Sequence, residues 1–244
     1  CRPTNPTMSI QTTLGEPQPT LPKIDKSERD VIFTANGSSQ ASEDVWRTGA
    51  LVGYESMNIR PPAHIPAEFI DWPFSKVREM DDPDLGELFD QHLKVVRAER
   101  PKYTVAPDVN QFTDLEDAVS WANELQEYAE IVIMVPKAVL PSDIPPEFRV
   151  GMPCQDRFGP PPWKWRQYKP CNEVHCLGGS PIDHTQIMKY SIPVESVDTA
   201  VPVYTANFGS YWGGRKWEKG DFGYYGSIKR SYKNMRYSLN RRRD

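Results

Sequence analysis

The segment "TDLEDAVSWANELQEYAEIVIMVPK" (113–137) predicts one helix followed at once by one strand. Thr113 and Glu116 form a capping-box pattern at the helix start. The apolar residues that follow have helical spacing: Leu115, Val119, Ala122, Leu125 and Ala129. The run "IVIMVPK" (131–137) is almost continuously apolar, which is typical of a strand buried on both faces. This segment therefore predicts an α/β protein with a parallel sheet.

The same alternation of apolar runs and helical patterns continues on both sides of this segment. Six further strands are predicted, at 30–36, 67–74, 102–109, 148–155, 173–179 and 194–200. Further helices are predicted at 84–100, at 181–190 and at 41–53, where Ser42 could cap the helix and Gly53 could end it. Seven strands at this spacing favour a compact TIM-like (β/α) barrel. An open doubly wound sheet remains the alternative, because no eighth strand is evident.

The segments outside the repeating pattern divide the chain into three parts. Residues 1–29 are rich in Pro, Thr, Gln and Ser and predict a disordered or loosely attached lead-in. Residues 30–210 carry the barrel, with an irregular Pro- and Trp-rich link at 156–172. Residues 211–244 form a basic, aromatic extension with a predicted helix at 227–243.

Composition excludes several classes of protein. The 244 residues carry a net charge of only −4, so no global field indicates nucleic acid. No run approaches the roughly 18 apolar residues of a membrane span, and no apolar signal-peptide region is visible, so a cytoplasmic location is expected. No Gly-rich fingerprint follows the first strand, which leaves a dinucleotide cofactor unsupported. We expect no cofactor.

The cysteines give only a weak indication of a metal site. Cys171, His175 and Cys176 are close enough in sequence to suggest zinc, but a structural site usually needs a second ligand pair. We therefore predict no metal and interpret the thiols as buried. Strand alternation directs either His175 or Cys176 into the barrel, where a hydrogen-bonded core histidine is the simpler interpretation.

Polar residues or glycines stand at the end of six predicted strands. They are Asp71, Asp108, Lys137, Gln155, the pair Gly178–Gly179, and Asp198. Each one alone could be a helix cap or, for Asp198, a structural carboxylate. Together they would meet at the C-terminal mouth of a barrel, where active sites of this fold lie. Three carboxylates with a Gln suit nucleophilic and acid–base chemistry on a purine, and a Gly pair lets the backbone approach a flat ring.

Three short motifs in this order resemble the tRNA-guanine transglycosylases. The segments "RVGMPCQ" (149–155), "VHCLGGSP" (174–181) and "SVDTAVPVYTANFG" (196–209) are similar to the family strands that carry its Gln, its Gly-Gly pair and its nucleophile. The likeness covers roughly residues 30–210 and extends to short phage and archaeal relatives, some of which modify DNA. The resemblance implies a (β/α)8 barrel that exchanges guanine in DNA or tRNA for a 7-deazaguanine.

The resemblance also implies a role for each strand-end residue. Asp198 would attack the ribose C1′ carbon, and Asp71 would act as acid and base. Asp108 and Gln155 would recognise the base, with backbone contacts from Gly178 and Gly179; Lys137 is a further candidate for substrate binding. The chain departs from the family pattern after Asp71, where Trp-Pro-Phe replaces Ser-Gly-Gly, and it lacks the family's zinc motif, because no Cys or His follows His184.

The C-terminal extension is a candidate nucleic-acid contact. Residues 215–244 contain ten Lys or Arg against three Asp or Glu, interleaved with aromatic residues. This combination suits phosphate contact and base stacking, although a solvated basic helix is the alternative. The predicted contact residues are Arg215, Lys216, Lys229, Arg230, Lys233, Arg236, Arg241 and Arg242.

Two functions remain open from the sequence. The first is an enzyme that exchanges a base through a covalent Asp198 intermediate. The second is a barrel of the same descent that binds nucleic acid or a deazapurine without turnover. A metal-dependent barrel hydrolase is disfavoured by the four histidines and the absence of His-x-His after the first strand. Neither the choice between DNA and tRNA nor the oligomeric state follows from the sequence.

Overall fold

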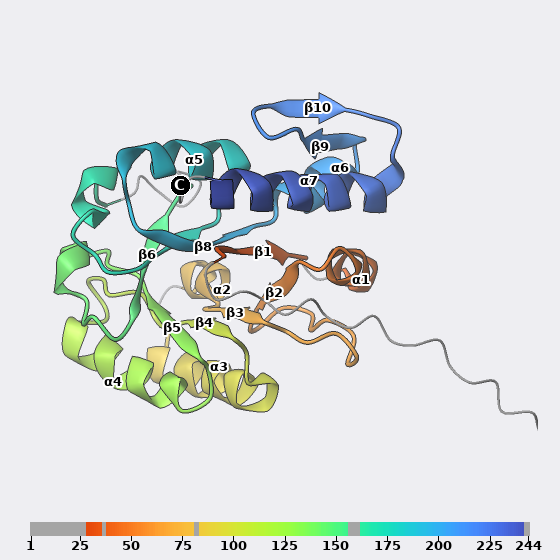
Figure 1. Cartoon of the computed structure of the whole chain (residues 1–244). Helices are drawn as coiled ribbons and strands as arrows, with labels where there is room; N and C mark the ends of the chain where they lie inside the picture. Colours follow the sequence, from red (N-terminus) through yellow and green to blue (C-terminus); the bar gives the residue numbers. More distant parts are fainter. Residues whose placement is uncertain (1–27, 36–37, 81–82, 156–161, 242–244) are drawn as a thin grey trace, which may run out of the picture.

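Eight short, largely apolar strands form the centre of the molecule. The computed structural model describes residues 28–35, 38–80, 83–155 and 162–241. The strands are β1 (Asp30–Thr34), β2 (Leu51–Glu55), β3 (Phe69–Asp71), β4 (Tyr103–Val105), β5 (Ile131–Met134), β6 (Arg149–Pro153), β7 (Val174–Leu177) and β8 (Val194–Thr199). They pair in parallel in chain order, and β1 closes the ring on β8 (Figure 1). The predicted TIM-like barrel is confirmed, and the sheet is not open.

Helices connect most of the strands on the outside of the barrel. They are α1 (Ser39–Arg47), α2 (Phe74–Glu79), α3 (Leu85–Glu99), α4 (Leu115–Gln126), α5 (Pro181–Ile187), α6 (Val201–Ala206) and α7 (Gly223–Asn240). Short 3-10 turns, η1 (Pro141–Asp143) and η2 (Trp165–Tyr168), lie in the connections that follow β5 and β6, and η3 (Met188–Tyr190) extends α5. A small antiparallel hairpin, β9 (Ser210–Trp212) with β10 (Trp217–Lys219), precedes α7.

The strand that the sequence pattern misses is β2. The predicted helix 41–53 is wrong in its second half, because α1 ends at Arg47 and the chain reverses through Gly49, whose φ of +85° suits glycine. Gly53 does not end a helix but lies inside β2, between β1 and β3. A Cβ atom there would lie 2.8 Å from Cδ1 of Phe69, so the missing side chain makes room for a bulky neighbour in the core.

The ends of several predicted elements move by a few residues. Asp114, not Thr113, caps α4 by accepting a hydrogen bond from the Asp117 amide, while Thr113 is buried. Ser38 rather than Ser42 caps α1. Strand β8 continues through Asp198 to Thr199 before α6 begins. These shifts arise because neighbouring Ser, Thr and Asp residues can all cap a helix, and tertiary packing decides between them.

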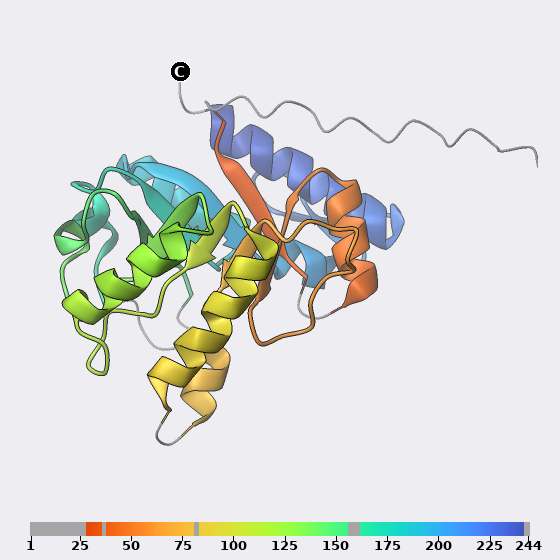
Figure 2. The ribbon, with the colours of Figure 1, turned by 90° about the horizontal axis from the view of Figure 1, so that it is seen from below.

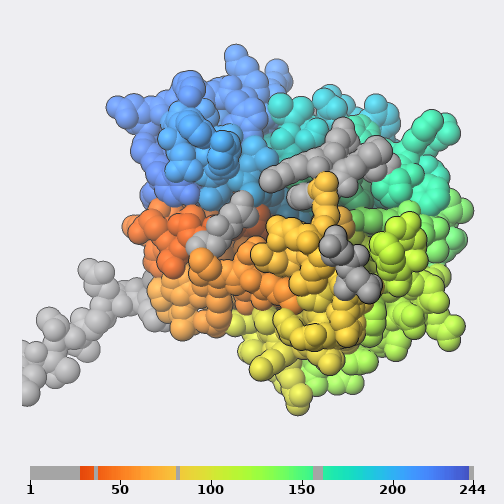
Figure 3. Space-filling model, turned by 180° about the vertical axis from the view of Figure 1, so that it is seen from behind, coloured from red at the N-terminus to blue at the C-terminus, as the bar shows by residue number. Residues whose placement is uncertain are grey.

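The C-terminal helix α7 packs against the start of the barrel. Viewed from below, it lies beside β1, on the side of the barrel away from α3 and α4 (Figure 2). From behind, the C-terminal segments (blue) again adjoin the N-terminal ones (red to orange) (Figure 3). Residues 28 and 29 of the predicted lead-in are tied to this corner, because Glu28 pairs with Arg236 and the Arg29 Nε donates to the Val194 carbonyl (2.7 Å). Residues 1–27 lie outside the described part of the chain.

Among the helices of the described residues, none has both the length and the apolar character needed to cross a membrane.

Candidate active site at the mouth of the barrel

The carboxyl ends of the parallel strands bring the predicted site residues to one end of the barrel. Asp71 is the last residue of β3, and Asp198 is the second-to-last residue of β8. The Gly178–Gly179 pair follows β7, and Gln155 follows β6 by two residues. Asp108 and Lys137 follow β4 and β5, where a bridge between Val109 and Pro136 prolongs the pairing of these two strands.

Asp198 is held firmly by one of its two carboxylate oxygens. The residue is only 6% exposed. Its Oδ1 accepts a hydrogen bond from the Gly178 amide (2.9 Å) and lies 3.1 Å from Nε2 of His175. Within the described residues, Oδ2 has no hydrogen-bond partner. The arrangement therefore fixes the carboxylate while leaving one oxygen for another contact.

The His175 ring is oriented by a second hydrogen bond. Its Nδ1 lies 2.7 Å from Oγ of Ser196, which accepts a hydrogen bond from Nη1 of Arg149 (2.9 Å). The Ser196 hydroxyl proton is then directed at Nδ1, so the single proton of a neutral ring belongs on Nε2, facing Asp198. Burial lowers the pKa of His175 and keeps the ring neutral, although the Asp198 carboxylate opposes that shift. His175, not Cys176, is thus the residue that faces the barrel interior.

The Gly178–Gly179 pair follows a path that other residues would disturb. Both residues have positive φ, +61° and +79°. A Cβ on Gly178 would lie 2.8 Å from Nε2 of Gln155, and one on Gly179 would lie 2.7 Å from Cβ of Cys154. The Gly178 carbonyl lies 2.7 Å from Nε2 of His184. The pair therefore places its backbone directly beside the Gln155 side chain and Asp198, as the sequence predicted.

Asp71 lies in a crowded group of acids. Burial raises its pKa well above the usual range, and the charges of Asp198, Glu55 and Asp108 raise it further, in that order. The carboxyl group of Asp71 is therefore biased towards its protonated form, beside a nucleophile candidate. Glu55 is not among the predicted site residues, because the sequence pattern predicts a helix up to Gly53 and no strand that would end at Glu55. Burial also raises the pKa of Glu55, which accepts a hydrogen bond from Ser75 Oγ (2.6 Å).

The charge of Lys76 partly counteracts the rise that burial causes in the pKa of Glu55, and a second cation, Lys137, pairs with Asp108. The Lys137 Nζ lies 2.5 Å from Oδ2 of Asp108 and 3.7 Å from the centre of the Phe74 ring. Burial raises the pKa of Asp108, while Lys137 partly counteracts this shift. Phe74 belongs to the Trp-Pro-Phe segment that departs from the transglycosylase pattern, and here its ring supports the lysine.

The thiols do not assemble a metal site among the residues described. No group of three or more His, Cys, Asp or Glu residues there could hold a metal ion. His175 is committed to Ser196 and Asp198, and Cys176 is fully buried. Cys154 lies against Cys176, and their hydrogen bond, followed by burial, raises the pKa of the Cys154 thiol well above normal.

The predicted nucleic-acid contacts do not all line one groove. Arg215, Lys216 and Arg241 line a groove together with Lys189, which the sequence pattern did not reveal. The other described residues of the predicted set lie elsewhere on α7, namely Lys229, Arg230, Lys233 and Arg236. Arg230 stacks on Phe222 (3.7 Å from its ring centre), Lys229 lies near the Tyr225 ring and Arg236 pairs with Glu28. Arg242 lies outside the described residues.

A comparison with solved structures agrees with the barrel. The chain is similar to the monomers generated from the dimeric phosphoribosylanthranilate isomerase of Thermotoga maritima, with a TM-score of 0.50 and 14% identity. The likeness covers 85% of this chain and 98% of the isomerase chain. At this identity it shows the fold alone.

The remaining comparisons concern sequence families. Among curated proteins, none matches this sequence. Residues 45–240, from α1 to the last residue of α7, match the family described as "Family of unknown function (DUF6610)". The matched range includes every described residue of the mouth discussed above and most of the barrel. The chain therefore belongs to this DUF6610 family.

Proposed function

We propose that the protein exchanges a guanine in a polynucleotide for a free 7-deazaguanine, with Asp198 as the nucleophile. The observation that carries this proposal is the pairing of two unlike carboxyl groups at one mouth. Asp198 is oriented by the Gly178 amide and by His175, with Oδ2 free of partners among the described residues. Asp71 has a raised pKa and so is available as a proton donor. A carboxylate nucleophile beside a carboxyl group that can give and take a proton is what a double displacement at a glycosidic carbon requires.

In the first step the old base leaves. Oδ2 of Asp198 attacks C1′ of the target nucleotide, and the bond between C1′ and the guanine nitrogen breaks. Asp71 donates its proton to the departing guanine, which leaves as a neutral base. The products are a covalent ester between Asp198 and the sugar, an ionised Asp71 and free guanine. Burial of the mouth strengthens these charge interactions relative to water.

In the second step the new base enters. The ring nitrogen of a 7-deazaguanine attacks C1′ and loses its proton to Asp71, and the ester electron pair returns to Asp198. The enzyme is restored, and two inversions retain the sugar configuration. Asp108 and Gln155, with the backbone of the Gly178–Gly179 pair, are placed to read the hydrogen-bonding edges of the base.

The test measures label transfer. The protein is incubated with radiolabelled guanine, or with a labelled 7-deazaguanine, in the presence of DNA or of bulk tRNA. We expect label to enter one polymer, and we expect Asp198→Asn to reduce entry by about 10⁴-fold or more. Asp90→Asn is the matched control, because Asp90 is an exposed acid on α3.

Two results would contradict the proposal. Asp198→Asn could transfer label as fast as wild type, which would exclude Asp198 as the nucleophile. Alternatively, the wild-type protein could transfer no label from either base, although it binds the polymer or the base as tightly as Asp198→Asn does. That second result would favour the binding barrel without turnover. A protein–oligonucleotide adduct that survives denaturing electrophoresis, and is absent in Asp198→Asn, would identify the covalent intermediate directly.

A further inference from the structure

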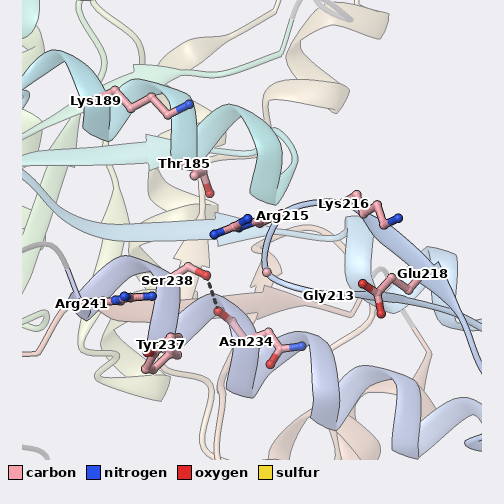
Figure 4. Close-up of a pocket in the computed structure, with 11 residues that line it drawn as sticks. Thr185, Lys189, Gly213, Arg215, Lys216, Glu218, Asn234, Tyr237, Ser238 and Arg241 are labelled. Carbon is pink, nitrogen blue, oxygen red and sulfur yellow. Dashed lines mark hydrogen bonds between the residues drawn. The ribbon is translucent and has the colours of Figure 1, made fainter.

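A groove of about 890 Å³ lies between α5, the loop joining β9 to β10, and the C-terminal half of α7 (Figure 4). This groove, here called the α5–α7 groove, lies on the flank of the barrel and is lined by none of the acids of the mouth. Thr185 and Lys189 border it on one side, and Asn234, Tyr237 and Arg241 border it on the other. Its volume is in the range of ligand-binding pockets in proteins.

The charge of the groove is opposite to that of the whole protein. Four cations line it, namely Lys189, Arg215, Lys216 and Arg241. The single acid is Glu218, whose Oε2 accepts a hydrogen bond from the Tyr211 hydroxyl (2.7 Å). None of the four cations forms an ion pair with another described residue. A concentration of unpaired cations in a chain of net charge −4 predicts an anionic ligand.

The groove also contains an exposed aromatic ring and neutral polar side chains. Tyr237 is 63% exposed, and the guanidinium of Arg241 lies 5.7 Å from the centre of its ring. Asn234 is held in place by donating from Nδ2 to the Trp212 carbonyl (2.7 Å), and Ser238 donates to the Asn234 carbonyl (2.7 Å). An exposed aromatic ring beside a guanidinium is a stacking surface for a nucleobase.

The cations are spread along the walls of the groove rather than gathered at one point. Figure 4 shows Lys189 in η3 after α5, Arg215 and Lys216 on the hairpin loop, and Arg241 directly after α7. A single phosphate group would favour cations that converge on it. An extended chain of phosphates favours cations set at intervals, which is the arrangement seen.

One border of the groove is a helix that begins at the mouth. Helix α5 starts at Pro181, directly after the Gly178–Gly179 pair and Ser180. Thr185 and Lys189, which line the groove, lie further along this segment, away from the mouth.

We propose that the α5–α7 groove binds the phosphodiester backbone of a single-stranded polynucleotide. This inference rests on the proposed function for its choice of polymer, because an enzyme that exchanges a base must act on a nucleotide that has left the base stack. Arg215, Lys216, Lys189 and Arg241 contact phosphates, and Tyr237 stacks on a base. Cations elsewhere on α7, such as Lys229 and Lys233, lie outside the groove and do not contribute.

The test measures binding of a fluorescein-labelled 20-nucleotide single strand, as DNA and as RNA, by anisotropy at several salt concentrations. The variant Arg215→Ala/Lys216→Ala is compared with the control Lys229→Ala/Lys233→Ala, which removes the same charge from exposed positions outside the groove. Each lost phosphate contact flattens the salt dependence by about 0.7, so the groove variant should lose about 1.4 in slope and bind about 20-fold more weakly at 0.1 M salt. The control should match wild type. Both variants should keep the wild-type melting temperature, because the four side chains are exposed.

Three outcomes would overturn the inference. Wild-type affinity in the groove variant would exclude phosphate contact there. Equal losses in both variants would show diffuse attraction to a basic surface instead of binding in a groove. Displacement of the labelled strand by inorganic phosphate or a mononucleotide at micromolar concentration would indicate a small-anion site.

A second variant, Tyr237→Ser, tests stacking separately from charge. It should weaken binding without changing the salt slope. The binding assay needs no turnover, so it separates the two proposals. Binding in the groove without base exchange would refute only the proposed function, and base exchange with unchanged affinity in the groove variant would refute only this inference.

Discussion

The two ends of the barrel interior differ in how their charged side chains are paired. At the N-terminal end, Asp30 pairs with Lys102 (2.6 Å) and accepts a hydrogen bond from the Tyr103 hydroxyl, while Arg149 pairs with Glu173. At the mouth, four acids lie close together: Asp71, Asp198, Glu55 and Asp108. Lys137 pairs with Asp108, and the charge of Lys76 acts on Glu55. The base of the barrel neutralises its charges, and the mouth leaves acids facing one another.

This difference is what the proposed function predicts: charge pairs that stabilise the base, and acids left for chemistry at the mouth. Acids that lie close together with few cations nearby lower the stability of the folded protein. Such groups occur mainly at functional sites. The two ends are connected, because Arg149 also donates to Ser196, which orients His175 towards Asp198. Charge pairing at the base is thus linked to the orientation of Asp198 at the mouth. Three substitutions can break or sharpen the contrast.

The largest expected effect is at the paired end. Arg149→Met should lower the free energy of unfolding by about 3 kcal/mol, because it removes a buried guanidinium and leaves the polar groups of Tyr103 and Ser196 without their donor. The lost pair with the half-exposed Glu173 adds little to this effect. For a chain of this size the melting temperature should fall by roughly 10 °C.

The matched control for this change is Arg60→Met, which breaks the exposed ion pair with Glu99 at the surface. That variant should lose at most about 1 kcal/mol. Calorimetry or urea unfolding measures both variants. Equal stability of Arg149→Met and wild type would mean that the base of the barrel does not depend on this buried guanidinium.

A smaller effect of opposite sign is expected at the mouth. Asp71→Asn should stabilise the protein on the order of 1 kcal/mol at pH 7, while impairing base exchange. The pKa of Asp71 is raised in the folded protein, so the folded state holds the proton more tightly than the unfolded chain does. The wild type therefore loses stability as pH rises from the unfolded pKa near 3.8 to the folded value, and the Asn variant lacks this loss.

The measurement is urea unfolding of both proteins at a series of pH values. The stability difference between Asp71→Asn and wild type should be near zero below pH 3.8, grow through the acidic range and then level off. A variant that is less stable than wild type at pH 7 would show that Asp71 supports the fold instead of straining it.

The smallest expected effect concerns Glu55, whose charge contributes less to the Asp71 pKa than burial and Asp198 do. Glu55→Gln keeps an oxygen that can accept from Ser75 but removes the negative charge. The pKa of Asp71 should therefore move down towards its usual range, as followed by carbon NMR of the carboxyl groups against pH. An unchanged titration would place Glu55 outside the group of interacting acids.

The sequence predicted the barrel and the strand-end residues because both follow from short-range patterns. Apolar runs located seven strands, and the parallel arrangement brought Asp71, Asp108, Gln155 and Asp198 to one end. Strand β2 is missed because "ALVG" (50–53) also fits the helical pattern predicted over 41–53. In the folded protein Gly53 lies inside the strand, where the Phe69 side chain leaves no room for a Cβ atom. This contact cannot be predicted from the sequence around Gly53, because Phe69 belongs to the next strand.

The connections between elements could not be predicted in the same way. The chain from Arg149 through Ser196 and His175 to Asp198 joins three strands across the barrel interior. Lys189 joins the α5–α7 groove from a helix far from the basic extension in sequence. Such contacts depend on the closed ring, because periodicity reports which face a residue occupies but not which residue it meets there.

Closure of the ring between β1 and β8 also has a consequence during synthesis. Asp30 pairs with Ser196, so β1 leaves the ribosome well before its partner strand exists. At typical translation rates the delay is roughly 10–30 s, during which the apolar strand "DVIFT" (30–34) has an unpaired edge. An open sheet edge of this kind is where nascent chains aggregate. A nascent chain of this protein that stalls before β8 should therefore be a substrate for chaperones, whereas the released chain should not.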